Sequence, residues 1–395
     1  MMNARAVPLW LVLTLLFGIQ PVATDLYLPA LPEIAASFGG QVDAVQWTLT
    51  VYVLAFGLTQ LFIGTLADRY GRRKVMLTAL ALYVLASIVP ALVNSLGILI
   101  LCRALQGVAT ASCAVSARAV IRDRYCEGAG MRVMAQSMTG MSAAALMSPV
   151  IGGLSTSVMG WQGTLSLVGA IGAAIWLIVY FGFPDTHAPA ASGAQAGFGV
   201  FLRRGQFVFS SLLAGASFSG AISFLLLSSF IFIGEYGMSR FHYGLVVAAC
   251  SLCFMLGTLA CRRYLSHATV PQAIRAGAAL TVTGGASQLL LWLAGVREPW
   301  ALIVPQCIYM LGHGFHQPCG QAGAVAPFPQ AAGRAASTSG FLLTAVAFTT
   351  GQCAAASPLP PAQTLVTVVS LMSAFIAFNA WFAIPRAYRA RAVPA

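Results

Sequence analysis

The stretch Gly64–Val75 reads GTLADRYGRRKV and joins two long apolar runs of the chain. Gly64 permits close helix packing and Gly71 permits a tight turn, because glycine carries no side chain. Asp68 can pair with a cation or cap a neighbouring helix end, and the basic cluster Arg72–Lys74 is typical of a loop on the cytoplasmic side of a membrane. The stretch therefore predicts a short cytoplasmic turn between two membrane-spanning helices.

The composition of the whole chain also indicates a membrane protein. Of 395 residues, 59% are hydrophobic and 8% are charged, whereas a soluble domain carries about 25% charged residues. A net charge of +12 would suggest nucleic-acid binding in a soluble protein. Here the arginines lie in short clusters between apolar runs, so we expect the lipid bilayer as a partner and no nucleic acid.

Twelve segments are long and apolar enough to cross a membrane as helices, each of about 20 residues. With both termini in the cytoplasm, 18 of the 21 Lys and Arg residues lie on the cytoplasmic side. This asymmetry follows the positive-inside rule and supports the count of twelve. The predicted spans are 8–31, 44–66, 75–94, 97–118, 130–153, 162–183, 206–234, 243–262, 272–295, 299–320, 335–356 and 363–385.

The longest polar linker, 185–204, lies near the middle of the chain and is rich in Ala, Gly and Ser. It predicts an N-terminal six-helix bundle at 1–184, a flexible cytoplasmic linker and a C-terminal six-helix bundle at 205–395. An internal repeat supports this division, because the end of the second span recurs at 257–264 as GTLACRRY. Cys261 replaces the acid there, so the two loops cannot be equivalent.

The motif at 64–75 resembles motif A of the major facilitator superfamily. In that family the loop is a latch between the two halves of the protein in the outward-open state. The resemblance therefore implies a latch role for six residues: Gly64, Asp68, Arg69, Gly71, Arg72 and Arg73.

One arginine, Arg103, lies deep within a predicted span, and Asp25 is the only carboxylate clearly within one. Arg103, in a segment that resembles motif B of the same family, needs a partner, water or a functional reason, because an arginine at membrane depth costs at least ~2.5 kcal/mol. Asp25 lies at a similar depth, ~10 Å from the outer end of the first helix at ~1.5 Å per residue. Burial favours a neutral carboxyl and a nearby arginine favours a charged one, so this pair is suited to exchanging a proton. The alternatives are snorkelling of Arg103 and a static ion pair or helix cap at Asp25.

The fifth span contains SPVIGG, which resembles motif C, a motif associated with antiporters rather than symporters. Pro149, Gly152 and Gly153 match it, and Ser148 stands where glycine is usual. Simple close packing of helices is the alternative reading of these small residues.

Together these motifs resemble the Bcr/CflA drug:proton antiporter branch, whose most specific mark is the string DLYLPALP at 25–32. The resemblance implies an all-α major facilitator fold of twelve helices in two six-helix bundles, in a bacterial inner membrane. It also implies export of lipophilic cationic or neutral aromatic drugs in exchange for protons, and we expect a monomer. The implied lining of a central cavity includes Tyr27, Gln106, Phe218, Phe224, His313, Phe315, His316 and Gln317.

The sequence leaves alternatives open for the role of two histidines and for the transported compound. His313 and His316 can join a proton path, although such histidines are more often packing residues, and two histidines lack the further ligands of a metal site. Export of one metabolite, such as a sugar or an amino acid, is the alternative function. The sequence has no nucleophile–base constellation or phosphate-binding signature, so we expect neither an enzyme nor a cofactor.

Overall fold

The computed structural model describes residues 8–125, 127–183 and 198–389, and all the regular secondary structure within them is helical. The chain forms two compact units. One comprises Met1–Gly193 with Ser239–Ala248, and the other comprises Ala194–Met238 with Ala249–Ala395.

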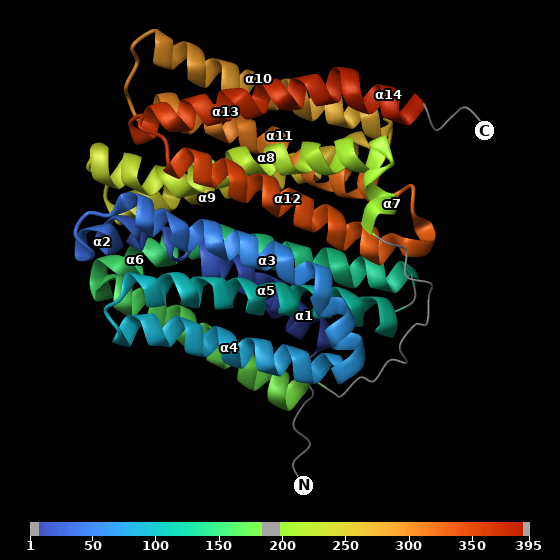
Figure 1. The fold of residues 1–395 in the computed structure, drawn as a ribbon, viewed down its shortest axis with the longest axis horizontal. Coiled ribbons are helices and arrows are strands. Elements are labelled where there is room, and N and C mark those ends of the chain that lie inside the picture. Colours follow the sequence, from blue (N-terminus) through green and yellow to red (C-terminus); the bar gives the residue numbers. More distant parts are fainter. Residues whose placement is uncertain (1–7, 126, 184–197, 390–395) are drawn as a thin grey trace. The chain divides into compact units, whose positions relative to one another are not determined.

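The first unit contains the helices up to α6 and the beginning of α9. Helix α3 packs against α5, α1 packs against α6, and α4 packs against both α5 and α6 (Figure 1). The elements are α1 (Leu9–Thr24), η1 (Leu28–Ala30), α2 (Leu31–Ser37), α3 (Val42–Tyr70), α4 (Arg72–Leu92), α5 (Leu96–Arg124), α6 (Glu127–Gly182) and the start of α9 (Arg240–Tyr264).

The first membrane helix is interrupted near its outer part. Helix α1 ends at Thr24, and the N–H of Asp25 donates to the carbonyl of Pro21 at 2.8 Å. A turn, the short helix η1 and then α2 follow. The predicted span 8–31 thus corresponds to the apolar span Leu9–Ser37, but its helix is interrupted after Thr24. Pro29 and Pro32 explain the interruption, because proline has no N–H to continue the helical hydrogen bonds.

Helix α6 contains two predicted spans joined at one residue. Gly160 has φ +67°, a backbone conformation that favours glycine, and the helical backbone is broken there. The part before Gly160 packs on α1, where Gly140 faces Thr14, and the part after it packs on α4, where Gly172 faces Tyr83. The fifth and sixth spans are thus separate helices with almost no connecting loop.

In the second unit, α8 packs against α11, α12 and α13, and α10 packs against α11 and α13. The predicted linker 185–204 lies outside the described residues up to 197, and its end forms the short helix α7, where Phe201 is fully buried against Phe207 and Phe328. The elements are α7 (Phe198–Leu202), α8 (Gly205–Ser229), η2 (Phe230–Glu235), the rest of α9, α10 (Val270–Leu293), α11 (Trp300–Val325), η3 (Pro329–Ala331), α12 (Ala332–Ala355), α13 (Pro361–Phe378), η4 (Asn379–Ala383) and α14 (Ile384–Arg389).

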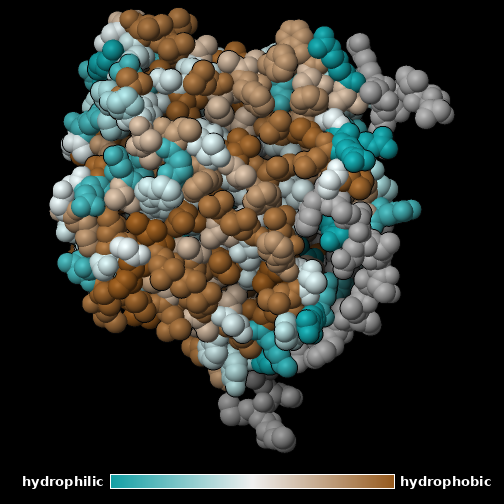
Figure 2. Space-filling model, in the orientation of Figure 1, coloured by the Kyte–Doolittle hydropathy of each residue, from teal (hydrophilic) through white to brown (hydrophobic). Residues whose placement is uncertain are grey.

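The outer surfaces of the helices are apolar. Leu92, Val158 and Phe181 are each about 80% exposed, which is expected of side chains that face lipid and not water. Figure 2 shows hydrophobic residues over much of the visible face, with hydrophilic residues mostly toward its left and right margins. Within the described residues, nine helices are long and apolar enough to cross a membrane, one of which, Arg132–Gly182, holds two predicted spans.

The predicted all-α membrane fold of about twelve helices is confirmed. Helices α11 and α12 complete the set, although they are not among those nine. Polar side chains such as Gln306, His313 and His316 lower the hydropathy of α11.

Candidate functional site

Arg103 of α5 is the centre of a buried polar cluster in the first unit. Its side chain is 1% exposed. Nη1 donates to the carbonyl of Ala23 at 2.7 Å and to Oε1 of Gln106 at 2.6 Å, and Nε donates to the carbonyl of Thr48 at 3.3 Å. The guanidinium also lies over the rings of Tyr27 and Tyr52, with Cζ at 4.4 and 4.9 Å from the ring centroids. Arg103 therefore binds inside the protein rather than snorkelling toward the membrane surface.

Two predicted binding residues belong to this cluster. Gln106 donates from Nε2 to the hydroxyl of Ser87 at 2.8 Å, and the hydroxyl of Tyr27 donates to Oγ1 of Thr48 at 3.0 Å. Both side chains are fully buried. Their polar atoms hold the cluster together, and the part of the chain that the structure describes leaves them no surface open to water.

Asp25 lies beside this cluster without joining it. Its carboxylate accepts a hydrogen bond from the Thr24 hydroxyl at 2.8 Å, and the residue is 9% exposed. Among the described residues, no ion pair joins Asp25 to Arg103. The guanidinium instead binds the Ala23 carbonyl at the end of α1, where the interrupted helix leaves carbonyl groups without N–H partners. The direct contact expected from their similar depth is therefore absent.

The three residues of the antiporter-like motif lie at two close contacts within the first unit. A side chain at Gly152 would meet the backbone of Leu26, next to Asp25, and one at Gly153 would meet the backbone of Arg240 and Phe241. The carbonyl of Pro149 lies against Gly244 of α9. The motif thus packs α6 against the interrupted first helix on one side and against the start of α9 on the other.

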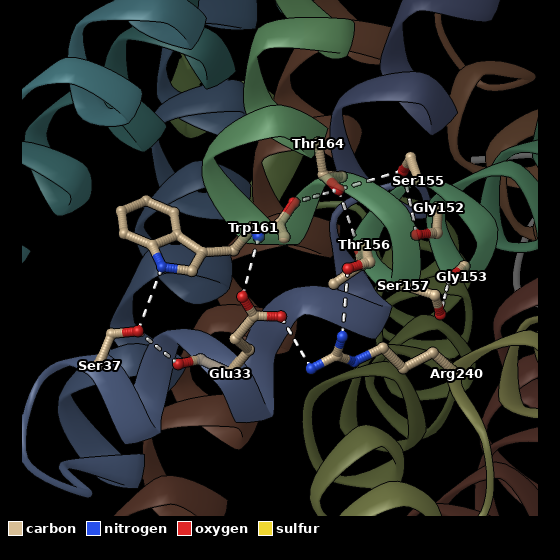
Figure 3. Close-up of polar contacts among 11 residues, drawn as sticks. Glu33, Ser37, Gly152, Gly153, Ser155, Thr156, Ser157, Trp161, Thr164 and Arg240 are labelled. Atoms are coloured by element: carbon tan, nitrogen blue, oxygen red, sulfur yellow. Dashed lines mark hydrogen bonds and ion pairs between the residues drawn. The ribbon is translucent and has the colours of Figure 1, made fainter.

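A hydrogen-bonded network surrounds the second of these contacts (Figure 3). Arg240 forms an ion pair with Glu33 of α2 at 2.8 Å and donates to the carbonyl of Thr156 at 3.1 Å. Glu33 also accepts from the N–H of Trp161 at 3.3 Å, just after the break at Gly160. This network, which the sequence analysis did not identify, ties α2, α6 and α9 together. Arg240 is one of the three Lys and Arg residues outside the cytoplasmic set of 18, and this was the only signal of the network in the sequence.

Reversing both charges of the Glu33–Arg240 pair tests this network. Glu33→Arg brings two cations together, so the variant is expected to unfold at a lower temperature than wild type, and Arg240→Glu is expected to do the same with two carboxylates. The double variant restores opposite charges and should recover most of the loss. Since both side chains are about 30% exposed, the pair contributes roughly 0.2–1 kcal/mol, and the difference should shrink in 1 M salt, where the Debye length is about 3 Å. A double variant no more stable than the worse single variant contradicts the pairing.

Gly152→Ala tests the contact with the interrupted helix. The added methyl group would lie 2.8–2.9 Å from the carbonyl carbon and Cα of Leu26, both of them backbone atoms. Overpacking of this kind costs about 1–3 kcal/mol, so we expect a lower unfolding temperature and impaired transport. The control is Gly97→Ala in α5, where the nearest atom is Ser95 Oγ at 4.0 Å. Equal unfolding temperatures for the two variants would contradict the close contact.

The motif A turn is tighter than a loop. Helix α3 extends to Tyr70, α4 begins at Arg72, and Gly71 alone joins them with φ +88°. Arg72 is buried and forms ion pairs with Asp68, at 3.4 Å, and with Asp123 at the end of α5. The predicted tight turn at Gly71 is confirmed.

The other residues of the turn face different surroundings. Arg73 donates to the carbonyl of Tyr180 at 2.6 Å, and Arg69 lies over the ring of Tyr70. A side chain at Gly64 would meet no atom within 4 Å, so the close packing expected of Gly64 is absent. Gly257 of α9, which corresponds to Gly64 in the repeat, does contact the backbone of Leu311. Cys261, which corresponds to Asp68, is fully buried, whereas Asp68 is exposed. The two repeated segments differ, as the loss of the acid predicted.

The remaining predicted binding residues lie in the second unit. His313 of α11 stacks near Phe218 of α8, with ring centroids 6.2 Å apart. Phe224 is buried against Phe232, and Phe315 lies against Tyr264. Their neighbour His316 is fully buried, whereas Gln317 is partly exposed and accepts a hydrogen bond from Gln321.

The fold and the motif geometry define a class of protein. The family model of the Major Facilitator Superfamily matches residues 13–351. The chain belongs to the major facilitator superfamily, and it is a multi-pass membrane transporter.

Comparisons with individual proteins refine this assignment. The chain is 28% identical to "Multidrug resistance protein D" of Escherichia coli (strain K12), over 87% of each chain. It is 24% identical to "Bicyclomycin resistance protein homolog" of Haemophilus influenzae, over 90% of this chain and 91% of the relative, which confirms the resemblance to the Bcr/CflA branch. Its fold is similar to that of a D-xylose-proton symporter, with a TM-score of 0.77, 11% identity and coverage of 96% and 98% of the two chains.

Proposed function

We propose that this protein is a proton-driven multidrug antiporter of a bacterial inner membrane, with both termini in the cytoplasm. Relatives that align over most of the chain are named for multidrug and bicyclomycin resistance. The observation that carries the proton coupling is the position of Asp25. Among the described residues it is the only buried carboxylate, and it lies at the interruption of a membrane helix with no ion-pair partner.

The Thr24 hydroxyl supplies a local response to the protonation of Asp25. It has two acceptors within reach, the carboxylate of Asp25 at 2.8 Å and the carbonyl of Gln20 at 3.2 Å, but it has only one proton to donate. With Asp25 charged, the hydroxyl donates to the carboxylate. With Asp25 protonated, the carboxyl group becomes a donor, and the hydroxyl is free to donate to Gln20 while it accepts from Asp25.

Arg103 serves as the positive charge near this site. Because it binds the Ala23 carbonyl, two residues from Asp25, movement at the interruption is transmitted to α5 through a hydrogen bond. The alternating-access cycle then couples one change of charge at Asp25 to drug movement. A proton motive force of ~100 mV supplies ~2.3 kcal/mol per charge.

The proposed cargo is lipophilic, either cationic or neutral and aromatic. Of the aromatic candidates, Phe218 is partly exposed and offers a ring face that suits such compounds, whereas Tyr27, Phe224 and Phe315 are buried and would have to become accessible during the cycle. The six motif A residues are proposed to latch the two halves, and Pro149, Gly152 and Gly153 are proposed to hold the interrupted helix in the form that antiport requires.

The test is drug-evoked proton release from acidified everted vesicles that contain the protein. Addition of a tetraphenylphosphonium salt or chloramphenicol should release protons, whereas sugars and amino acids should not, and vesicles without the protein serve as the control. Release evoked by one sugar or amino acid but by no drug would establish the metabolite exporter instead. Silence with every compound, from protein shown to be folded, would refute proton antiport.

A further inference from the structure

Two buried histidines of α11 share one serine hydroxyl in the second unit. Ser217 Oγ of α8 lies 2.8 Å from Nδ1 of His313 and 3.2 Å from Nδ1 of His316. His313 is 4% exposed and His316 is fully buried. The two rings are three residues apart on one face of the helix, so both turn toward the same point on α8.

The hydroxyl has one proton, which restricts the states of the cluster. It can donate to only one of the two Nδ1 atoms, so the other ring must donate its own Nδ1–H to Ser217 Oγ. When one proton is added, both rings can donate to the two lone pairs of Oγ, and the hydroxyl proton is free to turn to a backbone carbonyl of its own helix. The cluster therefore accepts one proton without leaving a clash between donors, and the charge resides on one imidazolium.

Burial favours the neutral form of both rings, so within the described residues a charge there is stabilised only by Ser217 and by the neighbouring aromatic rings. His313 lies between the rings of Phe218 and Phe254, and the Phe254 centroid is 4.9 Å from that of His313, within cation–π range. The His316 ring packs against Gly277 of α10. A methyl group added at Gly277 would lie 3.0 Å from Nε2 of His316, so the glycine leaves room for the ring. The His316 ring also interacts with the backbone of Ile274 on α10.

Few other ionisable groups face the cluster. Tyr309 of α11 donates to the backbone carbonyl of Ser217, and the thiols of Cys261 and Cys319 lie 3.6 Å apart near Phe315. Helices α8 and α13 carry no ionisable side chain, and Arg275 of α10 is exposed. The only carboxylates described in this unit, Glu235 and Glu298, are exposed. Among the described residues of this unit, these histidines are the only buried basic side chains.

We propose that Ser217, His313 and His316 form a second proton-binding site, which takes up one proton in each transport cycle in addition to the proton on Asp25. This inference rests on the proposed proton-driven antiport. A second proton would move a second charge across the membrane, and at ~100 mV it raises the attainable drug gradient by roughly a further 50-fold.

The direct test is a pH titration of the purified full chain, labelled with ¹⁵N at histidine, without any drug. The chain has five histidines. His313→Gln and His316→Gln assign their signals, and His267→Gln at an exposed position is the control. We expect the two buried rings to titrate together and to take up one proton between them. Two rings that stay neutral down to the lowest pH at which the protein remains folded would overturn the proposal, whatever transport assays show.

The second test counts protons per drug molecule in proteoliposomes. The ratio should be about two in wild type and His267→Gln, and about one in His316→Gln and Ser217→Ala. An unchanged ratio in both of these variants, with the proteins shown to be folded, would overturn the proposal. A wild-type protein that moves drug without protons would refute antiport itself, and the drug-free titration separates that failure from the failure of this site.

Discussion

Vesicles that contain Asp25→Asn are expected to release at most about half as many protons per drug molecule as wild type, because only the histidine site proposed for the second unit remains. Asparagine keeps the size and the hydrogen-bonding shape of the carboxyl group but cannot exchange a proton. Because Asp25 is the only buried carboxylate among the described residues, the first unit then has no other acidic group at that depth. The measurement is the drug-evoked change of a pH-sensitive dye inside acidified everted vesicles.

The matched control for this variant is Asp43→Asn, which removes a carboxylate from an exposed position at the start of α3. It should release protons like wild type. We also expect Asp25→Asn to keep the exchange of labelled for unlabelled drug, since that process needs no change of protonation. Drug-evoked release equal to that of wild type in Asp25→Asn would contradict the role of Asp25 in proton coupling.

Replacement of Arg103 by Met is expected to lower both stability and transport more than any other single change in the buried cluster. It leaves the carbonyls of Ala23 and Thr48 and Oε1 of Gln106 without this donor. Each buried acceptor left unpaired costs about 1–3 kcal/mol, and the relief from burying a charge offsets part of that sum. We expect a net loss of about 2–4 kcal/mol in the free energy of unfolding, measured by thermal or denaturant unfolding in detergent.

Arg103→Lys separates the charge from the geometry. Lysine keeps the positive charge, but its ammonium group lacks the planar fork that reaches Ala23, Thr48 and Gln106 together. Stability should recover in part while drug-evoked proton release stays low. The control is Arg275→Met, since Arg275 is exposed on α10. If Arg103→Met unfolds at the temperature of Arg275→Met, the cluster does not depend on the guanidinium.

The sequence predicted the helices well because their apolar length and the charge asymmetry are properties of short segments. It predicted the turn at Gly71 for the same reason. It did not predict the interruption after Thr24, although Pro29 and Pro32 were visible, because apolar residues continue through the break. The sequence placed Arg103 and Asp25 at a similar depth in the membrane but did not specify the direction of the Arg103 side chain. In the structure the guanidinium binds backbone carbonyls rather than Asp25.

Contacts between distant segments were the least predictable part of the site. Glu33 and Arg240 are far apart in the chain, and no local pattern pairs them. The close contact of Gly152 with Leu26 was open to prediction only as a general tendency of small residues to permit helix crossing. The sharing of Ser217 by two histidines needed the relative rotation of α8 and α11, which hydropathy does not specify.

The break at Gly160 bears on how the chain enters the membrane during synthesis. With one residue between the fifth and sixth spans, there is no hydrophilic loop that could be translocated on its own after the first of these helices has been inserted. Backbone polar groups cannot remain unpaired in lipid, so the two helices are best inserted together as a single hairpin with Trp161 at its tip, where the N–H of Trp161 then meets Glu33 of α2. The one-residue connection at Gly160 thus favours insertion of the fifth and sixth helices in a single step.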